Sequence, residues 1–160
     1  MDTVSGRVDL RLARPEDTPA CVAILRALPD WFGIEASIQH YASEVPALST
    51  CLAVGDDRVL GFLTLKRHFA DSGEIYVLGV RPELHGRGVG TALVRWAEDT
   101  LRAEGRRYLQ VKTLGPSHPS AHYARTRAFY RARGFAPLEE LPDIWPGNPC
   151  LIMIKCLRAG

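Results

Sequence analysis

The chain of 160 residues has the length of one domain, and its 46% hydrophobic and 24% charged residues are ordinary for a globular protein. Its formal net charge of +2 is too small for the electrostatic footprint of a nucleic-acid binder. The cysteines show no C-x-x-C and no Cys/His spacing typical of a metal site; they are Cys21, Cys51, Cys150 and Cys156. We therefore expect one domain over residues 1–160, free thiols, no metal and no nucleic-acid partner.

No stretch of the sequence is long and apolar enough to span a membrane, and no basic segment followed by an apolar run opens the chain. These two observations predict a cytoplasmic protein without a membrane partner.

The first half of the chain predicts a strand, two helices and a hairpin. Residues 8–12 alternate between apolar and polar with the period of a strand. Residues 14–28 open with Arg-Pro-Glu-Asp, which suits a helix start because proline and acidic residues are favoured in the first turn. Apolar residues recur at helical spacing over 35–48, and residues 51–54 and 59–65 predict a hairpin around a Gly-Asp-Asp turn.

The second half predicts alternating strands and helices, which makes the chain a mixed α/β protein. Residues 75–80 form a nearly continuous apolar run, as expected of a strand covered on both faces. Gly79 within it indicates a bulge, or a close approach by a ligand or another backbone. Residues 142–149 are rich in Pro and Gly and predict a loop. The other predicted elements are strands at 108–114, 135–141 and 150–157 and a helix at 123–133.

A glycine-rich segment, His85-Gly86-Arg87-Gly88-Val89-Gly90-Thr91, leads from the apolar strand into a helix that runs to Glu104. On the polar face of this helix, Glu98 and Arg102 predict an i, i+4 ion pair. A helix N-terminus opened by glycines offers backbone N–H groups and the positive end of its dipole to an anion. With Arg81 and Arg87 nearby in sequence, the segment predicts a phosphate cradle.

The spacing of the glycines excludes two common nucleotide motifs. The dinucleotide fingerprint needs glycine at 91 or 93, where this chain has Thr91 and Leu93, and a P-loop needs a lysine that is absent. The segment instead resembles the acyl-CoA-binding motif Q/R-x-x-G-x-G/A of the GNAT superfamily of N-acetyltransferases. His85 stands where the family usually has Gln or Arg.

A second segment supports the resemblance. Residues 128–135, Ala-Phe-Tyr-Arg-Ala-Arg-Gly-Phe, are similar to the family's closing signature, in which a helix carries F/L-Y-x-x-x-G-F into the next strand. The resemblance covers the whole chain in element order. It implies an α+β fold in which a mostly antiparallel central sheet of about seven strands is flanked by about four helices.

The resemblance also implies a cofactor and its binding residues. Acetyl-CoA would be the acyl donor, and backbone N–H groups near Gly79 and Val80 would meet the oxyanion. Many members have an Asn where this chain has Tyr123, so either that hydroxyl substitutes or the contact is absent. The residues expected to bind the cofactor are Leu78, Gly79, Val80, His85, Gly86, Arg87, Gly88, Val89, Gly90, Thr91, Tyr123, Phe129 and Arg133.

Two residues are expected to be catalytic. Tyr130 would protonate the departing CoA thiolate, a feasible transfer because a phenol has a pKa near 10 and a thiolate about 8.5. Glu74 is the first candidate for the base that deprotonates the amine, directly or through water. A solvated acid at a strand end is the alternative for Glu74. His68, His118 and His122 are weaker candidates for the base.

The acceptor is expected to be a primary amine of a small molecule or a peptide, bound by Trp31, Phe32, Tyr41 and Trp145. Aromatic rings together with a carboxylate favour a cationic, partly apolar amine. Trp31, Phe32 and Trp145 also fit a plain packing role. The expected function is thus acetyl-CoA-dependent N-acetylation by direct attack on the thioester. Transfer of a larger acyl group such as succinyl, a non-catalytic acyl-CoA-binding or sensing module, and a homodimer stay open.

Overall fold

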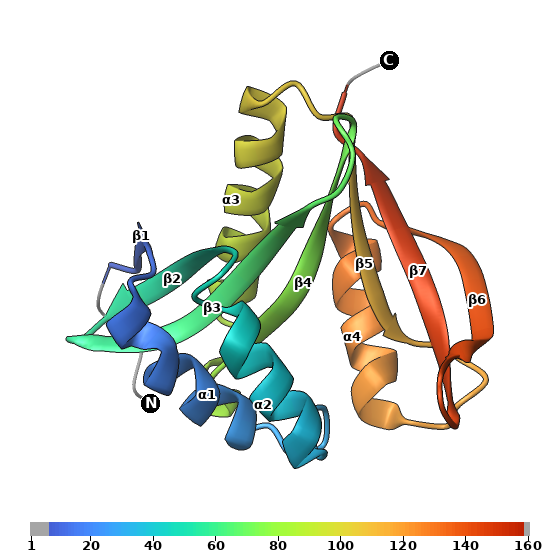
Figure 1. The fold of residues 1–160 in the computed structure, drawn as a ribbon, viewed down its shortest axis with the longest axis horizontal. Coiled ribbons are helices and arrows are strands. Elements are labelled where there is room, and N and C mark those ends of the chain that lie inside the picture. Colours follow the sequence, from blue (N-terminus) through green and yellow to red (C-terminus); the bar gives the residue numbers. More distant parts are fainter. Residues whose placement is uncertain (1–6, 159–160) are drawn as a thin grey trace. The chain divides into compact units, whose positions relative to one another are not determined.

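The computed structural model describes residues 7–158, which form seven strands and four α-helices (Figure 1). Hydrogen bonds connect the strands in the order β1-β2-β3-β4-β5-β7-β6. The pair β4–β5 is parallel, whereas β1–β2, β2–β3, β5–β7 and β6–β7 are antiparallel. The expected mixed α/β class with a mostly antiparallel seven-stranded sheet and four helices is confirmed.

The bounds of the elements agree with most of the predicted ranges. The strands are β1 (Asp9–Leu12), β2 (Ser49–Gly55), β3 (Arg58–Arg67), β4 (Ser72–Val80), β5 (Tyr108–Leu114), β6 (Ala136–Trp145) and β7 (Asn148–Cys156). The helices are α1 (Thr18–Arg26), α2 (Glu35–Glu44), α3 (Val89–Ala103) and α4 (Ala121–Ala132).

The chain divides into two compact units. Of the described residues, unit 1 contains 7–66 and 77–97, and unit 2 contains 67–76 and 98–158. Both β4 and α3 pass from one unit into the other, so neither unit is a continuous stretch of chain. That residues 1–160 form a single domain stays a prediction.

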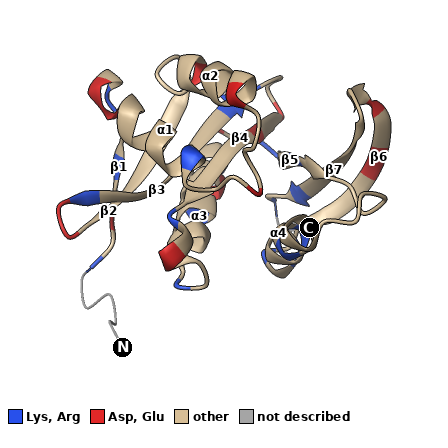
Figure 2. Ribbon diagram, turned by 90° about the horizontal axis from the view of Figure 1, so that it is seen from below, with Lys and Arg blue, Asp and Glu red and all other residues tan. Residues whose placement is uncertain are grey.

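Unit 1 has helices on both faces of its strands, and two glycines show why. A Cβ on Gly79 would lie 3.1 Å from Phe62 Cε1 and 3.2 Å from Ile24 Cγ2 of α1. A Cβ on Gly61 would lie 3.2 Å from Val89 Cγ1 at the start of α3. Figures 1 and 2 accordingly show α1 and α2 side by side on one face and α3 on the other. Core side chains therefore surround Gly79, whereas the bulge and the approach of a ligand or another backbone stay predictions.

In unit 2, α4 packs with β5. Ser120 caps α4 by accepting a hydrogen bond from the Tyr123 N–H at 3.3 Å, and Arg127 donates to the carbonyl of Leu114 at 2.7 Å. Gly134 follows the helix with φ +93°, the left-handed conformation that ends many helices. The predicted helix over 123–133 is confirmed to within two residues.

Charge is separated locally within unit 2, although the net charge of the chain is small (Figure 2). Basic residues lie on α4 and acidic residues on the edge strand β6. They are Arg125, Arg127 and Arg131 on the helix, and Glu139, Glu140 and Asp143 on the strand.

The predicted loop over 142–149 is wrong. Strand β6 continues to Trp145, which pairs with Asn148 of β7, so only a two-residue turn separates the strands. Gly147 makes that turn with φ +74°. Pro142 is compatible with β6 because this strand lies at the sheet edge and its register with β7 shifts between Leu141 and Trp145.

The predicted ion pair between Glu98 and Arg102 is also wrong. Glu98 is buried, with 7% of its surface exposed, and accepts a hydrogen bond from Lys155 of β7. Arg102 instead donates to the Leu157 carbonyl at 2.9 Å and to Asp99 at 3.3 Å. Packing of α3 turns Glu98 into the interior, and a buried carboxylate needs a partner that can reach it there.

Within residues 7–158, no helix is long and apolar enough to cross a membrane, and no group of three or more His, Cys, Asp or Glu could hold a metal ion. All four cysteines are free thiols.

Candidate active site

The glycine-rich loop of unit 1 enters α3 through two left-handed residues. Gly86 has φ +76° and Gly88 has φ +86°. A Cβ on either would meet nothing within 4 Å, so the backbone torsion and not crowding requires glycine. Helix α3 begins at Val89, and the Ala92 N–H bonds to the Gly88 carbonyl at 3.0 Å. The first turn of a helix presents N–H groups without intrahelical partners, which suits an anion.

His85 closes this loop onto the end of β4. Its Nε2 lies 2.9 Å from the carbonyl oxygen of Val80, and because a carbonyl can only accept, Nε2–H is the donor. The ring of Trp31 meets His85 edge-on at a centroid distance of 5.7 Å. The histidine thus has a structural task at the position where Gln or Arg was expected.

The arginines of the predicted cofactor site lie in different surroundings. Arg81 Nε donates to the Val59 carbonyl at 2.7 Å. Arg133 donates to the Phe129 carbonyl at 2.7 Å and lies 4.2 Å from the centre of that ring. Arg87 is exposed on the glycine-rich loop.

In unit 2, Glu74 of β4 is buried, with 4% of its surface exposed. Its Oε1 lies 2.7 Å from His68 Nε2 and 3.4 Å from Lys112 Nζ. The alternative of a solvated acid at a strand end is therefore wrong. Glu74 is instead a buried carboxylate with two nitrogen partners.

Among the three histidines weighed as alternative bases, the structure places His68 against Glu74. His122 Nδ1 lies 2.7 Å from Arg125 on α4, and His118 lies in the segment before that helix. The sequence analysis did not single out Lys112. Its signal was the alternation in β5, where the polar residues Gln110 and Lys112 lie on the same face of the strand.

Tyr130 lies in a buried aromatic cluster of unit 2. Its exposed fraction is 4%, and its ring meets Phe129 and Phe135 edge-on at centroid distances of 5.2 and 5.4 Å. Burial raises the pKa of Tyr130 well above its ordinary value of 10. The phenol therefore stays protonated at neutral pH.

The residues predicted to bind the acceptor are half-buried. In unit 1, Phe32 and Tyr41 meet edge-on at a centroid distance of 5.8 Å, and Trp31 contacts His85 as described above. Trp145 ends β6 in unit 2. Leu78 is half-buried near the end of β4, and Gly90 and Thr91 lie in the first turn of α3.

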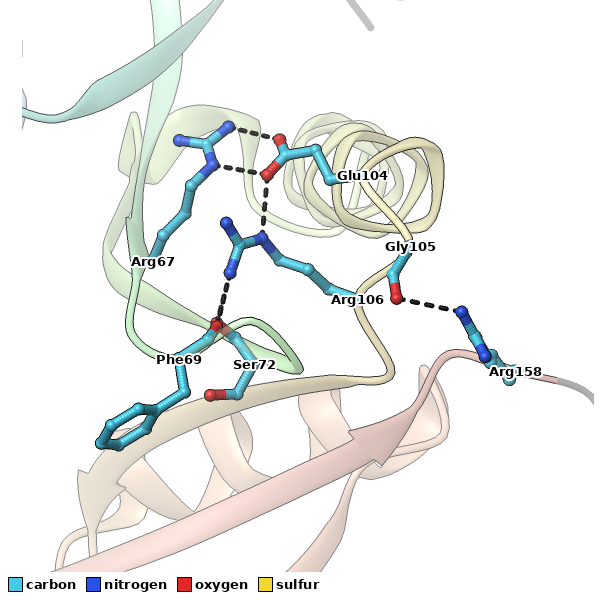
Figure 3. A network of polar contacts seen from close by, with 7 residues as sticks. All are labelled: Arg67, Phe69, Ser72, Glu104, Gly105, Arg106 and Arg158. Carbon is cyan, nitrogen blue, oxygen red and sulfur yellow. Dashed lines mark hydrogen bonds and ion pairs between the residues drawn. The ribbon is translucent and has the colours of Figure 1, made fainter.

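A network of arginines and one glutamate braces the turn between β3 and β4 (Figure 3). Arg67 binds Glu104 through two hydrogen bonds of 2.7 Å, and Arg106 Nε adds a third at 2.9 Å. Arg106 also donates to the Phe69 carbonyl at 2.5 Å. The hydrogen bonds from the two arginines, chiefly Arg67, lower the pKa of Glu104 to about 2.

This network predicts a pH-dependent effect of Glu104→Gln. Because the folded-state pKa is depressed from 4.5, the charged carboxylate stabilises the fold above about pH 4.5, and this is lost as the pH falls toward 2. We expect the variant to unfold about 1 kcal/mol more easily at pH 7. The difference in the free energy of unfolding between the variant and the native chain should vanish near pH 2. Urea unfolding at several pH values measures this difference. A stability difference that does not change with pH would show that the charge of Glu104 is not its cause.

A family model described as "Acetyltransferase (GNAT) family" matches residues 16–135, which are 120 of the 160 residues. The chain belongs to this family. The match begins before α1 and ends after Tyr130, so it includes both the glycine-rich loop and the aromatic cluster.

Two similar curated proteins are mycothiol acetyltransferases. The one from Beutenbergia cavernae is 43% identical over 84 residues, which cover 52% of this chain and 26% of that protein. The one from Actinosynnema mirum is 32% identical over 108 residues, covering 67% of this chain and 32% of that protein. The matched segments thus span only about a quarter to a third of these relatives.

Solved structures confirm the fold. A GNAT-family acetyltransferase from Desulfovibrio desulfuricans has a TM-score of 0.81 at 22% identity, covering 95% of this chain and 100% of that one. An aminoglycoside 6'-N-acetyltransferase in complex with coenzyme A has a TM-score of 0.73 at 18% identity, covering 95% and 98%. The yncA acetyltransferase of Salmonella typhimurium, solved with acetyl-CoA, has a TM-score of 0.72 at 16% identity, covering 96% of each chain.

Proposed function

We propose that this chain is an acetyl-CoA-dependent N-acetyltransferase that acetylates a primary amine by direct attack on the thioester. The observation that carries the proposal is membership of the GNAT acetyltransferase family, with the match covering the glycine-rich loop and Tyr130. Family structures in complex with coenzyme A or acetyl-CoA support the same acyl donor for this chain.

The proposed cofactor role of unit 1 rests on its backbone. The left-handed Gly86 and Gly88 lead into the first turn of α3, whose N–H groups and dipole suit the pyrophosphate of CoA. Leu78, Gly79 and Val80 at the end of β4 would bind the acyl group, with backbone N–H groups meeting the oxyanion.

The proposed proton transfers belong to unit 2. Glu74 takes a proton from the acceptor ammonium, directly or through water, since a primary amine with a pKa near 10 is mostly charged at neutral pH. The free amine attacks the thioester carbonyl. As the tetrahedral intermediate collapses, the C–S bond breaks and Tyr130 donates its proton to the CoA thiolate. The acylated nitrogen gives up its second proton, which restores the Tyr130 hydroxyl through solvent, and Glu74 releases the first proton to solvent.

The acceptor is proposed only as a class. The curated relatives are named for acetylation of mycothiol, which favours a small-molecule amine over a peptide. Binding by Trp31, Phe32, Tyr41 and Trp145, a cofactor contact by Tyr123, a homodimer and a cytoplasmic location are further parts of the proposal.

The test is CoA release from acetyl-CoA and succinyl-CoA with a panel of primary amines. Amine-dependent release from acetyl-CoA, with the acetylated amine found by mass spectrometry, is the expected result. Binding of acetyl-CoA without release on any amine would favour the non-catalytic module, and faster release from succinyl-CoA would favour transfer of the larger acyl group. Neither alternative is favoured by the comparisons.

The cradle predicts a specific loss of affinity in Gly88→Ala. The left-handed conformation costs a residue with a side chain about 1–2 kcal/mol, so the loop should leave this conformation in the variant. The same free energy corresponds to a loss of acetyl-CoA affinity of about 5- to 30-fold. Gly147→Ala is the matched control, because Gly147 has a similar φ of +74° in the β6–β7 turn. Calorimetric titration should show lower affinity only in Gly88→Ala. Equal affinities in both variants would argue against the cradle.

A further inference from the structure

The two nitrogen contacts of Glu74 converge on one of its oxygens. His68 Nε2 lies 2.7 Å from Oε1, and Lys112 Nζ lies 3.4 Å from the same atom. A carboxylate oxygen only accepts, so His68 donates through Nε2–H whichever charge the ring carries. With Oε1 held in this way, Oε2 is the oxygen that remains for an amine or a water molecule.

His68 makes the tighter of the two contacts and reaches Glu74 from outside the strand. The histidine lies in the turn between β3 and β4, and 27% of its side chain is exposed, against 6% for Glu74. Lys112 projects from β5 at a distance that is long for a hydrogen bond. Orientation of the carboxylate therefore depends mainly on where the turn holds the imidazole.

That turn is braced on both sides of His68. The preceding residue, Arg67, is tied to Glu104 by two hydrogen bonds, and Arg106 binds the carbonyl of the following residue, Phe69 (Figure 3). The His68 N–H also bonds to the Ser72 carbonyl at 3.2 Å. A surface turn with so many contacts holds its side chain in a defined place, as a site that must orient a base requires.

We propose that His68 is a positioning residue, which fixes Oε1 of Glu74 so that Oε2 faces the acceptor as the base. This inference rests on the proposed acetyl transfer with Glu74 as base. In the reaction Oε2 takes the proton of the ammonium, while the His68 proton stays on Nε2 and only its hydrogen bond to Oε1 is kept. Lys112 is the weaker second partner of Oε1.

The test compares His68→Ala with His68→Gln, using the amine that gives the fastest CoA release. A misplaced catalytic group can cost about 100-fold in rate, so His68→Ala should lower kcat about 10- to 100-fold with little change in the KM of the amine. His68→Gln keeps an N–H donor for Oε1 and should stay within about 5-fold of the native rate. Phe69→Ala is the matched control, because Phe69 lies in the same turn with 84% of its surface exposed, and this variant should keep the native kcat.

A double variant separates positioning from general damage to the fold. If His68 acts only through Glu74, then Glu74→Gln with His68→Ala should be no slower than Glu74→Gln alone. Multiplied losses in the double variant would overturn the inference, as would a native rate in His68→Ala. A His68→Gln variant as slow as His68→Ala would also overturn it, because the ring itself would then do the work.

Failure of the proposed acetyl transfer and failure of the positioning role of His68 give different experimental results. A native chain that binds acetyl-CoA but releases no CoA with any amine would overturn the acetyl transfer, and the positioning role with it. Release of CoA by the native chain together with normal rates in both His68 variants would overturn the positioning role alone.

Discussion

Tyr130→Phe is expected to lower kcat about 100-fold or more at pH 7 while leaving the affinity for acetyl-CoA unchanged. The phenylalanine keeps the edge-on packing with Phe129 and Phe135, so only the hydroxyl is lost. Without a proton donor the thiolate must leave charged, and general acid catalysis is typically worth 100- to 10,000-fold. Stopped-flow or steady-state CoA release measures the loss directly.

Tyr108→Phe is the matched control for this change. Tyr108 is a half-buried tyrosine of β5 whose hydroxyl accepts a hydrogen bond from Arg107 at 3.1 Å. It should keep the native kcat. A Tyr130→Phe variant within threefold of the native rate would show that the thiolate obtains its proton elsewhere.

The same tyrosine predicts a change in alkaline stability. Because burial raises the folded-state pKa of Tyr130, only the unfolded chain loses this proton just above pH 10. The free energy of unfolding should therefore fall as the pH rises beyond 10, and it should fall less steeply in Tyr130→Phe. Parallel unfolding curves for the two proteins between pH 9 and 11 would contradict the raised pKa.

Glu74→Gln is expected to lower kcat/KM of the amine about 100-fold at pH 7. Glutamine keeps the size of the side chain but accepts no proton from the ammonium. Only the small fraction of amine that is already neutral should react, so the rate should rise about tenfold per pH unit until the amine pKa near 10. Measuring kcat/KM from pH 6 to 9.5 tests this slope.

An exposed glutamate provides the control for Glu74→Gln. Glu139 lies on the edge strand β6 with its side chain in solvent, and Glu139→Gln should keep both the native rate and the native pH profile. A Glu74→Gln variant with the native profile would exclude Glu74 as the base. The positioning role of His68 would then be excluded as well.

The sequence predicted best what depends on short stretches of chain. The glycines of residues 86–91 predicted a loop that leads into a helix, and residues 128–135 predicted a helix that is followed by a strand. These patterns are local because torsion angles and helix stops are decided within a few residues. They also carried the resemblance to the family.

The errors concern partners that are distant in sequence. Glu98 was paired with its helical neighbour, but packing of α3 brings Lys155 to it from 57 residues away. The partners of Glu74 were not predicted, because they depend on the parallel pairing of β4 with β5 and on the turn that carries His68. Nothing in the local pattern distinguishes that histidine from a surface residue.

Prediction of the β6–β7 hairpin failed for a different reason. Its prolines and glycine are loop signals in general, yet at a sheet edge they cost the strand little. The edge position of β6 is a property of the whole sheet and could not be read from residues 142–149.

The most direct test of the central claim is a calorimetric titration of the native chain with acetyl-CoA, using NAD as the matched nucleotide control. A cradle for the CoA pyrophosphate predicts saturable binding of acetyl-CoA with a stoichiometry of one and no binding of NAD. Absence of acetyl-CoA binding, or equal binding of both, would contradict the assignment of the glycine-rich loop and the acetyl transfer built on it.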